Sequence, residues 1–370
     1  MNQPIRILQL FTILNRGGAE TNVMNYYRKL DKSKFQFDFV VHRQEEGAYE
    51  KEIIELGGKI FRFQNINPLH LNSYQKEIKD FFNNHHYQII HGQCSELGYY
   101  FYKEAHKRQV PVIIAHAHNS RAPFDLKFPF RWYWKKQMSN YINAYFSCGD
   151  AASKWFFGEK MASKAFVMTN AIDSEKFAYN SLKSDSMRKE LHADSTKNII
   201  HIGRFNLQKN HEFLITIFSE ILKKDATYKL FLVGEGELKH TIENKVNQLN
   251  SSKNVVFLGS RNDVNELLQA MDIFIFPSLF EGLPVALVEA QASGVKCFIS
   301  DGIPTEAILI PENVAVISLQ KTTQEWVDTI LSNNQFVKKD VSQLIIDKGY
   351  DINKNVKILE NKYLELLNRN

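Results

Sequence analysis

The sequence predicts an α/β protein with two facing, Rossmann-like, doubly wound domains. Short runs rich in β-branched and aromatic residues alternate with longer amphipathic stretches, and this alternation predicts parallel sheets covered by helices on both faces. The length of 370 residues suits two domains better than one. Because such sheets bind ligands outside the carboxyl ends of their strands, facing strand ends predict a binding cleft between the domains.

Each predicted element rests on its local pattern. We expect strands, by their β-rich composition, at residues 5–11, 37–42, 59–63, 87–93, 111–118, 144–149, 165–170, 198–203, 229–234, 255–259, 273–277, 297–300 and 315–318. We expect helices, by their apolar periodicity, at residues 19–30, 49–56, 73–83, 97–107, 211–222, 238–249, 264–271, 285–293 and 353–367.

The domain boundary is predicted where this alternation breaks. Residues 172–197 are polar and charged and are typical of a linker with a short helix. We therefore expect a first domain at 1–175 and a second at 176–352.

Composition excludes several classes of protein. The net charge of +5 lacks the clustered basic footprint of a nucleic-acid binder. The three cysteines form no C-x-x-C pair, so neither a disulfide framework nor a zinc site is indicated. There is no apolar run of the roughly 18 residues that a membrane span needs, and the N-terminus does not read as a signal peptide. We expect a cytoplasmic enzyme.

The strongest chemical signal is FEGLPVALVEAQASG, which follows the strand-like run IFIFPS. Pro284 suits the first helical turn, and Gly294 suits the position just past the helix end. The amides of Gly282, Leu283 and Val285 would then point from a helix N-terminus, which binds phosphate groups well. Two carboxylates, Glu281 and Glu289, flank this turn. A nucleotide sugar fits the pattern, whereas an isolated pair of glutamates is more often a loop charge and a solvated helix residue.

A second signal follows the first strand of the second half, where Gly203 and Arg204 precede Lys209. Arginine can clamp two oxygens and lysine acts as a point charge. Together they would stabilise charge on a departing diphosphate. Taken alone, the two cations could equally be solvated surface charges.

Two weaker signals lie in the first half. Gly17 and Gly18 would let the backbone approach a ligand closely, although a glycine pair is usually only a turn. His116 and His118 fall on one face of a predicted strand. A metal site there is disfavoured, because no Cys or Asp cluster completes it. Either histidine could also be an ordinary core or rim residue.

The stretch 127–138, KFPFRWYWKKQM, mixes aromatic and basic side chains. This composition suits a membrane interface. It also suits a helix that packs its aromatic side inward.

The segments GRFNLQKNHEFL, LVGEGEL, VVFLGSRNDV, MDIFIFPSLFEGLPVALVEA and NRGGAETNV resemble glycosyltransferase family four, whose members include capsule and exopolysaccharide enzymes. The resemblance covers nearly the whole chain. It implies the two-domain GT-B fold, with the helix at 353–370 packing back on an acceptor-binding first domain. It also implies that Arg204 and Lys209 hold the donor diphosphate, that Glu281 contacts the sugar and that Glu289 contacts the ribose.

The resemblance implies three further contacts. The backbone around residues 258–261, with Gly259 and Arg261, would hold the base. The loop at Gly17 and Gly18 would face the diphosphate, and a histidine would contact the donor sugar near the reacting carbon. By its position we favour His118, with His116 as the fallback.

These signals together predict a hexosyltransferase that takes a sugar from a nucleoside diphosphate, which we expect to be UDP. The resemblance implies that the anomeric configuration is retained and that the acceptor is a lipid-linked, cell-surface glycan. No cofactor and no metal are expected; the chain has no D-x-D and no P-loop motif. Gly234 and Gly236 are a fragment of a dinucleotide fingerprint, which we interpret as a strand-end turn. The alternatives are an epimerase or a sugar phosphorylase on this fold, and a non-catalytic partner subunit. The sugar, linkage, acceptor and oligomeric state stay open.

Overall fold

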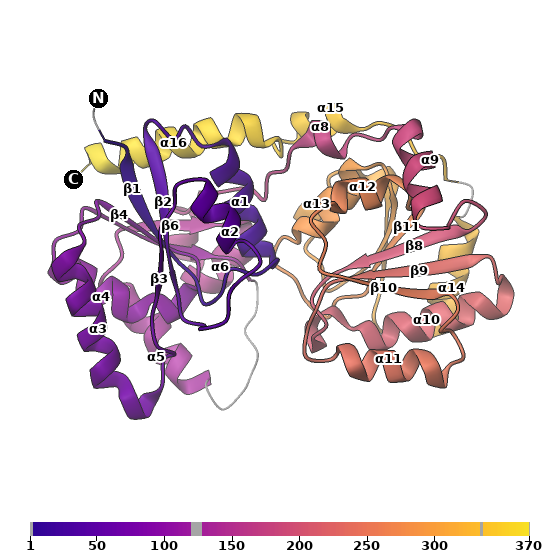
Figure 1. The fold of residues 1–370 in the computed structure, drawn as a ribbon, viewed down its shortest axis with the longest axis horizontal. Helices are drawn as coiled ribbons and strands as arrows, with labels where there is room; N and C mark the ends of the chain where they lie inside the picture. The colour runs from indigo at the N-terminus through magenta and orange to yellow at the C-terminus, as the bar shows by residue number, and fades with distance from the viewer. Residues whose placement is uncertain (1–2, 120–127, 334–335, 370) are drawn as a thin grey trace. The chain divides into compact units, whose positions relative to one another are not determined.

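The computed structural model describes residues 3–119, 128–333 and 336–369, and its contacts divide the chain into two compact units. The first unit comprises Met1–Thr169 and Ile352–Asn370, and the second comprises Asn170–Asp351. The boundary between them therefore falls six residues before the predicted one. Figure 1 shows the elements of each unit.

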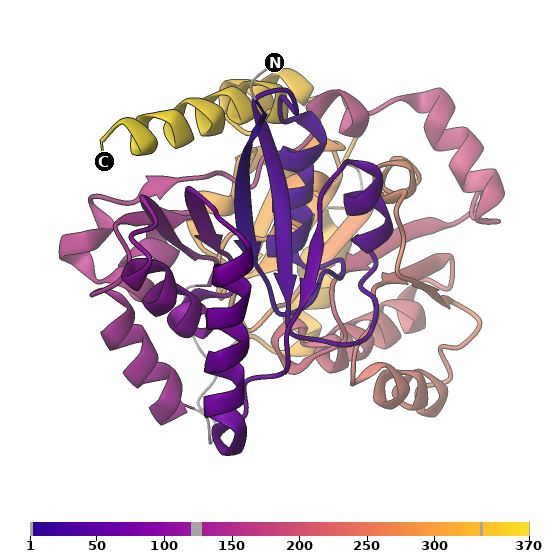
Figure 2. The ribbon, with the colours of Figure 1, turned by 60° about the vertical axis from the view of Figure 1, so that its left-hand side comes forward.

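Each unit contains a parallel sheet, which confirms the predicted fold class. In the described residues of the first unit, seven strands run in the order β3-β2-β1-β4-β5-β6-β7 (Figure 2). The strand bounds are β1 (Ile5–Leu10), β2 (Phe35–Val41), β3 (Ile60–Arg62), β4 (Ile89–Gly92), β5 (Val112–Ala117), β6 (Ala144–Ser147) and β7 (Phe166–Val167).

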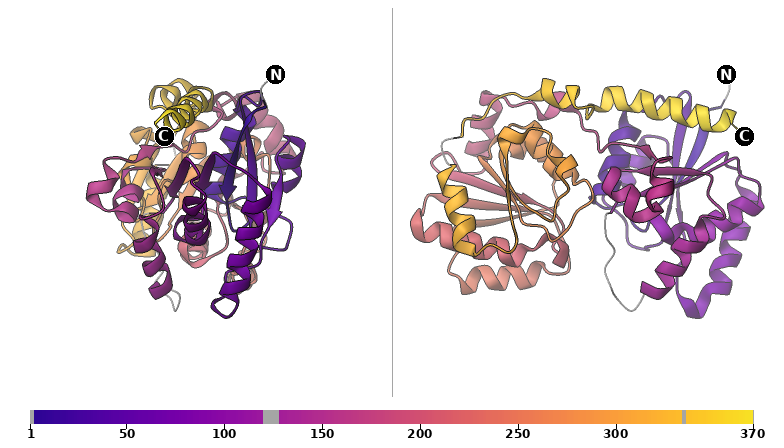
Figure 3. Two further views of the ribbon diagram at one scale, coloured as in Figure 1. Left: turned by 90° about the vertical axis from the view of Figure 1, so that its left-hand side faces the viewer. Right: turned by 180° about the vertical axis from the view of Figure 1, so that it is seen from behind.

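Helices cover both faces of this sheet. One face carries α1 and α16, and Tyr363 of α16 packs its ring against Phe37 and Phe146 (Figure 3). The other face carries α3, α4 and α5. The helix bounds are α1 (Gly18–Lys29), α2 (Glu50–Glu55), η1 (Pro68–His70), α3 (Leu71–Asn84), η2 (Ser95–Gly98), α4 (Tyr99–Lys107), α5 (Phe128–Met138), α6 (Asp150–Phe157), α7 (Glu159–Ala162) and α16 (Ile352–Asn368).

The second unit has six strands within its described residues, in the order β10-β9-β8-β11-β12-β13. Their bounds are β8 (Lys197–Ile202), β9 (Tyr228–Val233), β10 (Val255–Gly259), β11 (Ile273–Phe276), β12 (Lys296–Ser300) and β13 (Val314–Ile317). The helices are α8 (Ser174–Phe177), α9 (Ser181–Glu190), η3 (Leu207–Lys209), α10 (His211–Lys224), α11 (Lys239–Gln248), α12 (Val264–Gln269), α13 (Val285–Ala292), η4 (Thr305–Ala307), η5 (Pro311–Asn313), α14 (Thr323–Ser332) and α15 (Ser342–Asp347).

In both sheets the chain reverses its direction of winding between two central strands. This reversal falls between β1 and β4 in the first sheet and between β8 and β11 in the second. Loops that leave the carboxyl ends of such strands diverge, so each sheet has a natural ligand-binding position there.

Two expectations about elements need correction. The strand expected at 165–170 is only two residues long, because β7 is an edge strand that pairs with β6 alone. The predicted linker folds as α8 and α9, and α9 packs on α12 within the second unit. Among the described residues, no helix is both long and apolar enough to span a membrane.

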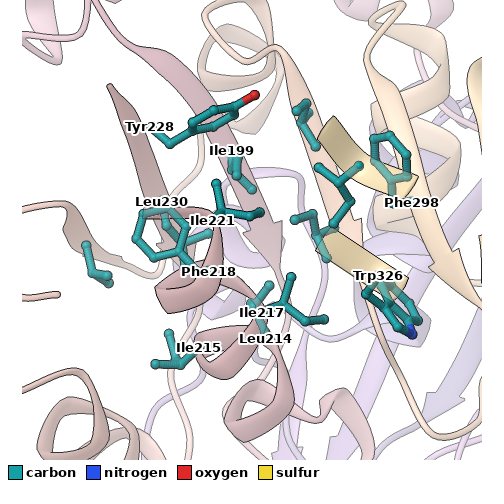
Figure 4. Packing of buried hydrophobic residues seen from close by; sticks show 14 of the residues in the cluster. Ile199, Leu214, Ile215, Ile217, Phe218, Ile221, Tyr228, Leu230, Phe298 and Trp326 are labelled. Carbon is teal, nitrogen blue, oxygen red and sulfur yellow. The ribbon is translucent and has the colours of Figure 1, made fainter. Parts of the chain in front are cut away.

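The core of the second unit packs α10 and α14 against the sheet. Leu214, Phe218 and Trp326 are fully buried with Ile199 and Leu230 (Figure 4). The Trp326 indole also donates a hydrogen bond of 3.1 Å to the carbonyl of Ser318.

We predict that Trp326→Ala lowers the free energy of unfolding by about 3–5 kcal/mol, because it removes a fully buried indole and leaves a cavity. Urea unfolding followed by circular dichroism measures this loss. Leu182→Ala, at a side chain that is 78% exposed, is the control and should change little. A loss below about 1 kcal/mol for Trp326→Ala would contradict the packing described above.

Candidate functional site

The loop after β8 is shaped by two asparagines. Asn206 caps η3 by accepting a hydrogen bond of 3.1 Å from the amide of Lys209. Asn210 has a φ of +55° and leads into α10. Asparagine tolerates this left-handed conformation better than most residues. The loop therefore presents Lys209 between a capped turn and the start of a helix.

Hydrogen bonds tie this loop to the loop after β11. The side chain of Gln208 donates to the carbonyl of Phe280 at 2.9 Å, and the carbonyl of Gln208 accepts from the amide of Leu279 at 2.8 Å. Asn210 donates to the carbonyl of Pro277 at 3.1 Å. Sequence reasoning missed Gln208 and Asn210, although the pattern N-x-x-K-N is typical of an asparagine-capped turn.

These ties bring Lys209 and Glu281 together. Lys209 Nζ lies 2.7 Å from Glu281 Oε1, and 4.5 Å from the centre of the Phe276 ring. The side chains are only 16% and 7% exposed, respectively. An ammonium group has three donor positions, so Lys209 can keep this bond and still bind a further anion.

Arg204, the other predicted cation, has a different partner. Its guanidinium lies 3.3 Å from Glu237, and both side chains are more than half exposed. The loop that carries Arg204 packs closely on the turn after β9. A Cβ on Gly234 would lie 2.1 Å from the carbonyl oxygen of Gly203. The strand-end turn expected at Gly234 and Gly236 is confirmed, since β9 ends at Val233.

The helix after Glu281 begins at Val285, as predicted, but Pro284 lies just before its first turn and not within it. Pro284 is the N-cap, with an extended ψ of 117°, and α13 starts at Val285. Gly294 has a φ of +67° and lies just past the helix end, as expected. Gly282 and Leu283 form the turn before the helix, and the side chain of Asn170 donates a hydrogen bond to the carbonyl of Leu283. This bond holds the turn in place before α13.

Glu289 lies inside α13 and is 9% exposed. At the edge strand β10, Gly259 has a φ of +65°, which glycine adopts without strain. Arg261 follows and binds Asp263 with a hydrogen bond of 2.8 Å. The predicted base-binding segment therefore lies at the same carboxyl edge of the sheet as the loops after β8 and β11.

Two buried histidines lie under the Lys209 loop. His201 donates from Nδ1 to the carbonyl of Ile275 at 2.9 Å, and its ring centre is 4.5 Å from that of His211. The His211 ring stacks on Phe205 at 4.2 Å. Burial, with a smaller contribution from the charge of Lys209, lowers the pKa of His211 to about 3. Both rings are neutral near pH 7, since burial also holds the pKa of His201 well below its usual range.

In the first unit, Gly17 is the extended N-cap of α1, and Gly18 is its first residue, so the pair opens a helix as predicted.

His116 and His118 share one face, as predicted, and their rings stack at 4.0 Å. His116 is fully buried, whereas His118 keeps some exposed surface. The neighbouring Ser120 and Lys127 lie outside the described residues. No set of three or more His, Cys, Asp or Glu side chains in the described ranges is arranged to hold a metal ion.

Comparison with known proteins identifies the family. Residues 183–340 match the family described as "Glycosyl transferases group 1", and residues 16–176 match "Glycosyltransferase Family 4". EpsF of Bacillus subtilis (strain 168), which is named as a glycosyltransferase, is 35% identical across 97% of this chain and 96% of that protein. The chain is a family-four glycosyltransferase.

Further relatives agree with this assignment. The UDP-Gal:alpha-D-GlcNAc-diphosphoundecaprenol alpha-1,3-galactosyltransferase of Escherichia coli is 26% identical across 77% of this glycosyltransferase and 69% of that enzyme. The crystal structure of Anabaena HepE in complex with UDP-glucose matches 97% of this chain and 100% of the HepE chain, with a TM-score of 0.79. The sequence identity between the two chains is 16%. The HepE comparison shows a shared GT-B fold.

Because His211 is buried and neutral, we expect the second unit to lose stability at acidic pH. The pKa of His211 is lower in the folded state than its ordinary value of 6.5. The unfolded chain therefore binds the proton first, and stability falls as the pH falls below about 6.5. From His211 alone we expect a loss of about 2 kcal/mol between pH 6.5 and pH 5.

Urea titrations at several pH values measure this dependence. His211→Phe keeps a ring against Phe205 but removes the titration, so its stability should fall less steeply with decreasing pH. His240→Phe, at a side chain that is 84% exposed, should keep the wild-type slope. Equal slopes for His211→Phe and wild type would contradict the expectation.

Proposed function

We propose that this glycosyltransferase retains anomeric configuration and transfers a sugar from a UDP-sugar to a hydroxyl of a growing, lipid-linked, cell-surface glycan. The observation that carries the proposal is the Lys209–Glu281 ion pair, held at the carboxyl edge of the second sheet directly before α13. A cation, a carboxylate and a helix N-terminus then converge where a sugar diphosphate needs all three. Two relatives support the donor and the acceptor: HepE is known with UDP-glucose, and the E. coli enzyme is named for a diphosphoundecaprenol acceptor.

In the proposed reaction, the bond between the anomeric carbon and the donor phosphate oxygen breaks, and a bond to the acceptor oxygen forms on the same face. The departing phosphate oxygen takes the acceptor proton. Lys209, Arg204 and the amides at the start of α13 stabilise the growing negative charge, in the role that other transferases give to a metal. Arg204 must leave Glu237 to do so, which costs little because that pair is exposed.

We assign each remaining part of the donor to its own residues. Glu281 binds hydroxyls of the transferred sugar, and Glu289 binds the ribose. The backbone at Gly259 and the segment at Arg261 bind the base. In the first unit, His118 contacts the donor sugar, and the amides of the Gly17 turn approach the diphosphate.

Thermal-shift measurements with UDP, GDP and their sugars test the donor. We expect UDP and UDP-sugars to raise the melting temperature without added metal and to do so more than GDP compounds, because binding to the folded state alone stabilises it. Lys209→Ala and Glu289→Ala should each lower kcat/KM at least about 10²-fold, or about 2.7 kcal/mol.

Lys223→Ala is the matched control, because Lys223 is an exposed lysine at the far end of α10, 69% exposed and paired with Glu220. It should transfer sugar at the wild-type rate. Normal transfer by Lys209→Ala and Glu289→Ala would refute the site assignment. Binding of UDP-sugar with no transfer to any acceptor would instead favour a non-catalytic partner subunit.

We further propose that α5 contacts a membrane surface. Phe130, Trp132 and Tyr133 are each more than half exposed on this helix. Lys136 is exposed beside them, with its ammonium 5.3 Å from the centre of the Trp132 ring. Trp134 instead packs on Tyr100, and Lys135 donates to the carbonyl of Trp155. Exposed aromatic side chains on a helix that also carries cations suit the interface of an anionic bilayer.

Co-sedimentation with vesicles of phosphatidylglycerol and phosphatidylcholine tests this surface. Replacing Phe130, Trp132 and Tyr133 by serine should lower the bound fraction several-fold, since apolar area no longer enters the interface. Leu279→Ser removes an exposed apolar residue in the second unit and should not. Equal binding by the triple variant and wild type would refute the proposed contact.

A further inference from the structure

A row of polar side chains crosses the central strands of the first unit, on the face that α1 and α16 cover. Gln9 lies in β1, His91 in β4 and His116 in β5, and all three are fully buried. Gln93 and His118 lie just beyond the ends of β4 and β5, and Gln93 is 5% exposed. Buried polar groups need hydrogen-bond partners, so the pairing within this row decides which atoms remain available.

The orientations of the Gln9 and Gln93 amides set the direction of the bond to His118. The Gln93 amide nitrogen donates to Gln9 Oε1 at 2.9 Å. The oxygen of the same amide, Oε1, therefore faces His118 and lies 2.7 Å from its Nε2. An amide oxygen only accepts, so Nε2 of His118 carries the proton. Nδ1 is then the ring atom with a lone pair.

The surroundings keep this ring uncharged. His118 stacks on His116, and His116 Nδ1 lies 3.1 Å from His91 Nε2. His91 in turn bonds through Nδ1 to the hydroxyl of Tyr363 at 2.8 Å. The side chains of Gln93, His116 and His91 are all neutral, and burial lowers the pKa of His118 to about 4. Near pH 7 the ring therefore holds one proton.

We propose that Gln93 is a positioning residue, which holds His118 as the Nε2–H tautomer so that Nδ1 accepts a hydrogen bond from a hydroxyl of the substrate. This inference rests on the proposed function, in which His118 contacts the donor sugar. A lone pair selects a group that can donate, so a sugar hydroxyl is a partner and a phosphate oxygen is not. A deoxy or methylated sugar at that hydroxyl loses the bond.

Two measurements on the full chain test the role of Gln93. The first is the tautomer of His118, read from two-bond ¹H–¹⁵N correlation spectra and assigned with His118→Ala. The second is kcat/KM between pH 5 and 8 for Gln93→Leu, Gln93→Glu, His118→Ala and the double variant Gln93→Leu with His118→Ala. Asn143→Leu is the matched control, because Asn143 bonds by its amide to Ile113 and Pro111 near the opposite end of β5.

We expect the Nε2–H tautomer in the wild type and a mixture in Gln93→Leu. Gln93→Leu should lower kcat/KM about 10-fold, and it should cause no further loss when His118 is already alanine. Gln93→Glu places a carboxylate beside Nε2, which raises the pKa of the ring, and we expect a new acidic limb between about pH 5 and 7. Asn143→Leu should keep the wild-type activity and pH profile.

An Nδ1–H tautomer in the wild type would overturn the inference. So would an equal loss from Gln93→Leu in the presence and absence of His118, since this pattern reports a structural role. If Lys209→Ala abolishes transfer but Gln93→Leu does not lower it, the inference fails and the proposed function stands. If no donor supports transfer, the spectra still decide the tautomer.

Discussion

The site in the second unit depends on the hydrogen bonds that join the loops after β8 and β11. The two strands pair with each other, but their loops leave the sheet where its winding reverses, so the loops diverge toward opposite faces. Gln208 and Asn210 close this gap by bonding to carbonyl and amide groups at residues 277–280. As a result, Lys209 meets Glu281 in a place with little solvent, where each charge needs the other.

Both units bury neutral histidines beneath the carboxyl ends of central strands. His201 and His211 lie under the Lys209 loop, and His91 and His116 lie under His118. In each case burial lowers the pKa, so the rings act as uncharged hydrogen-bonding and packing groups. Because these buried rings carry no charge, the charge near each site comes from groups at its surface, such as Lys209.

Several features were predictable because their cause is local. Gly294 was correctly placed past the end of α13, since only glycine adopts a φ of +67° there easily. The expectation for Pro284 was wrong by one residue, because a proline suits both the N-cap and the first turn. The helix α14 was not predicted, although Thr322 and Glu325 form a capping box that could have indicated it.

The sequence by itself determined the α/β class, the position of most elements and the residue types that could bind a sugar diphosphate. These features can be read from the sequence because they depend on residues close together in the chain. They are the hydrophobic periodicity, the glycine positions and the spacing of Glu281 and Glu289. The tertiary structure alone decided that Lys209 pairs with Glu281, that Arg204 pairs with Glu237, and that Gln93 faces His118. Each of these pairs joins residues that follow the ends of different strands, and only the order and register of the sheet bring such residues within hydrogen-bonding distance.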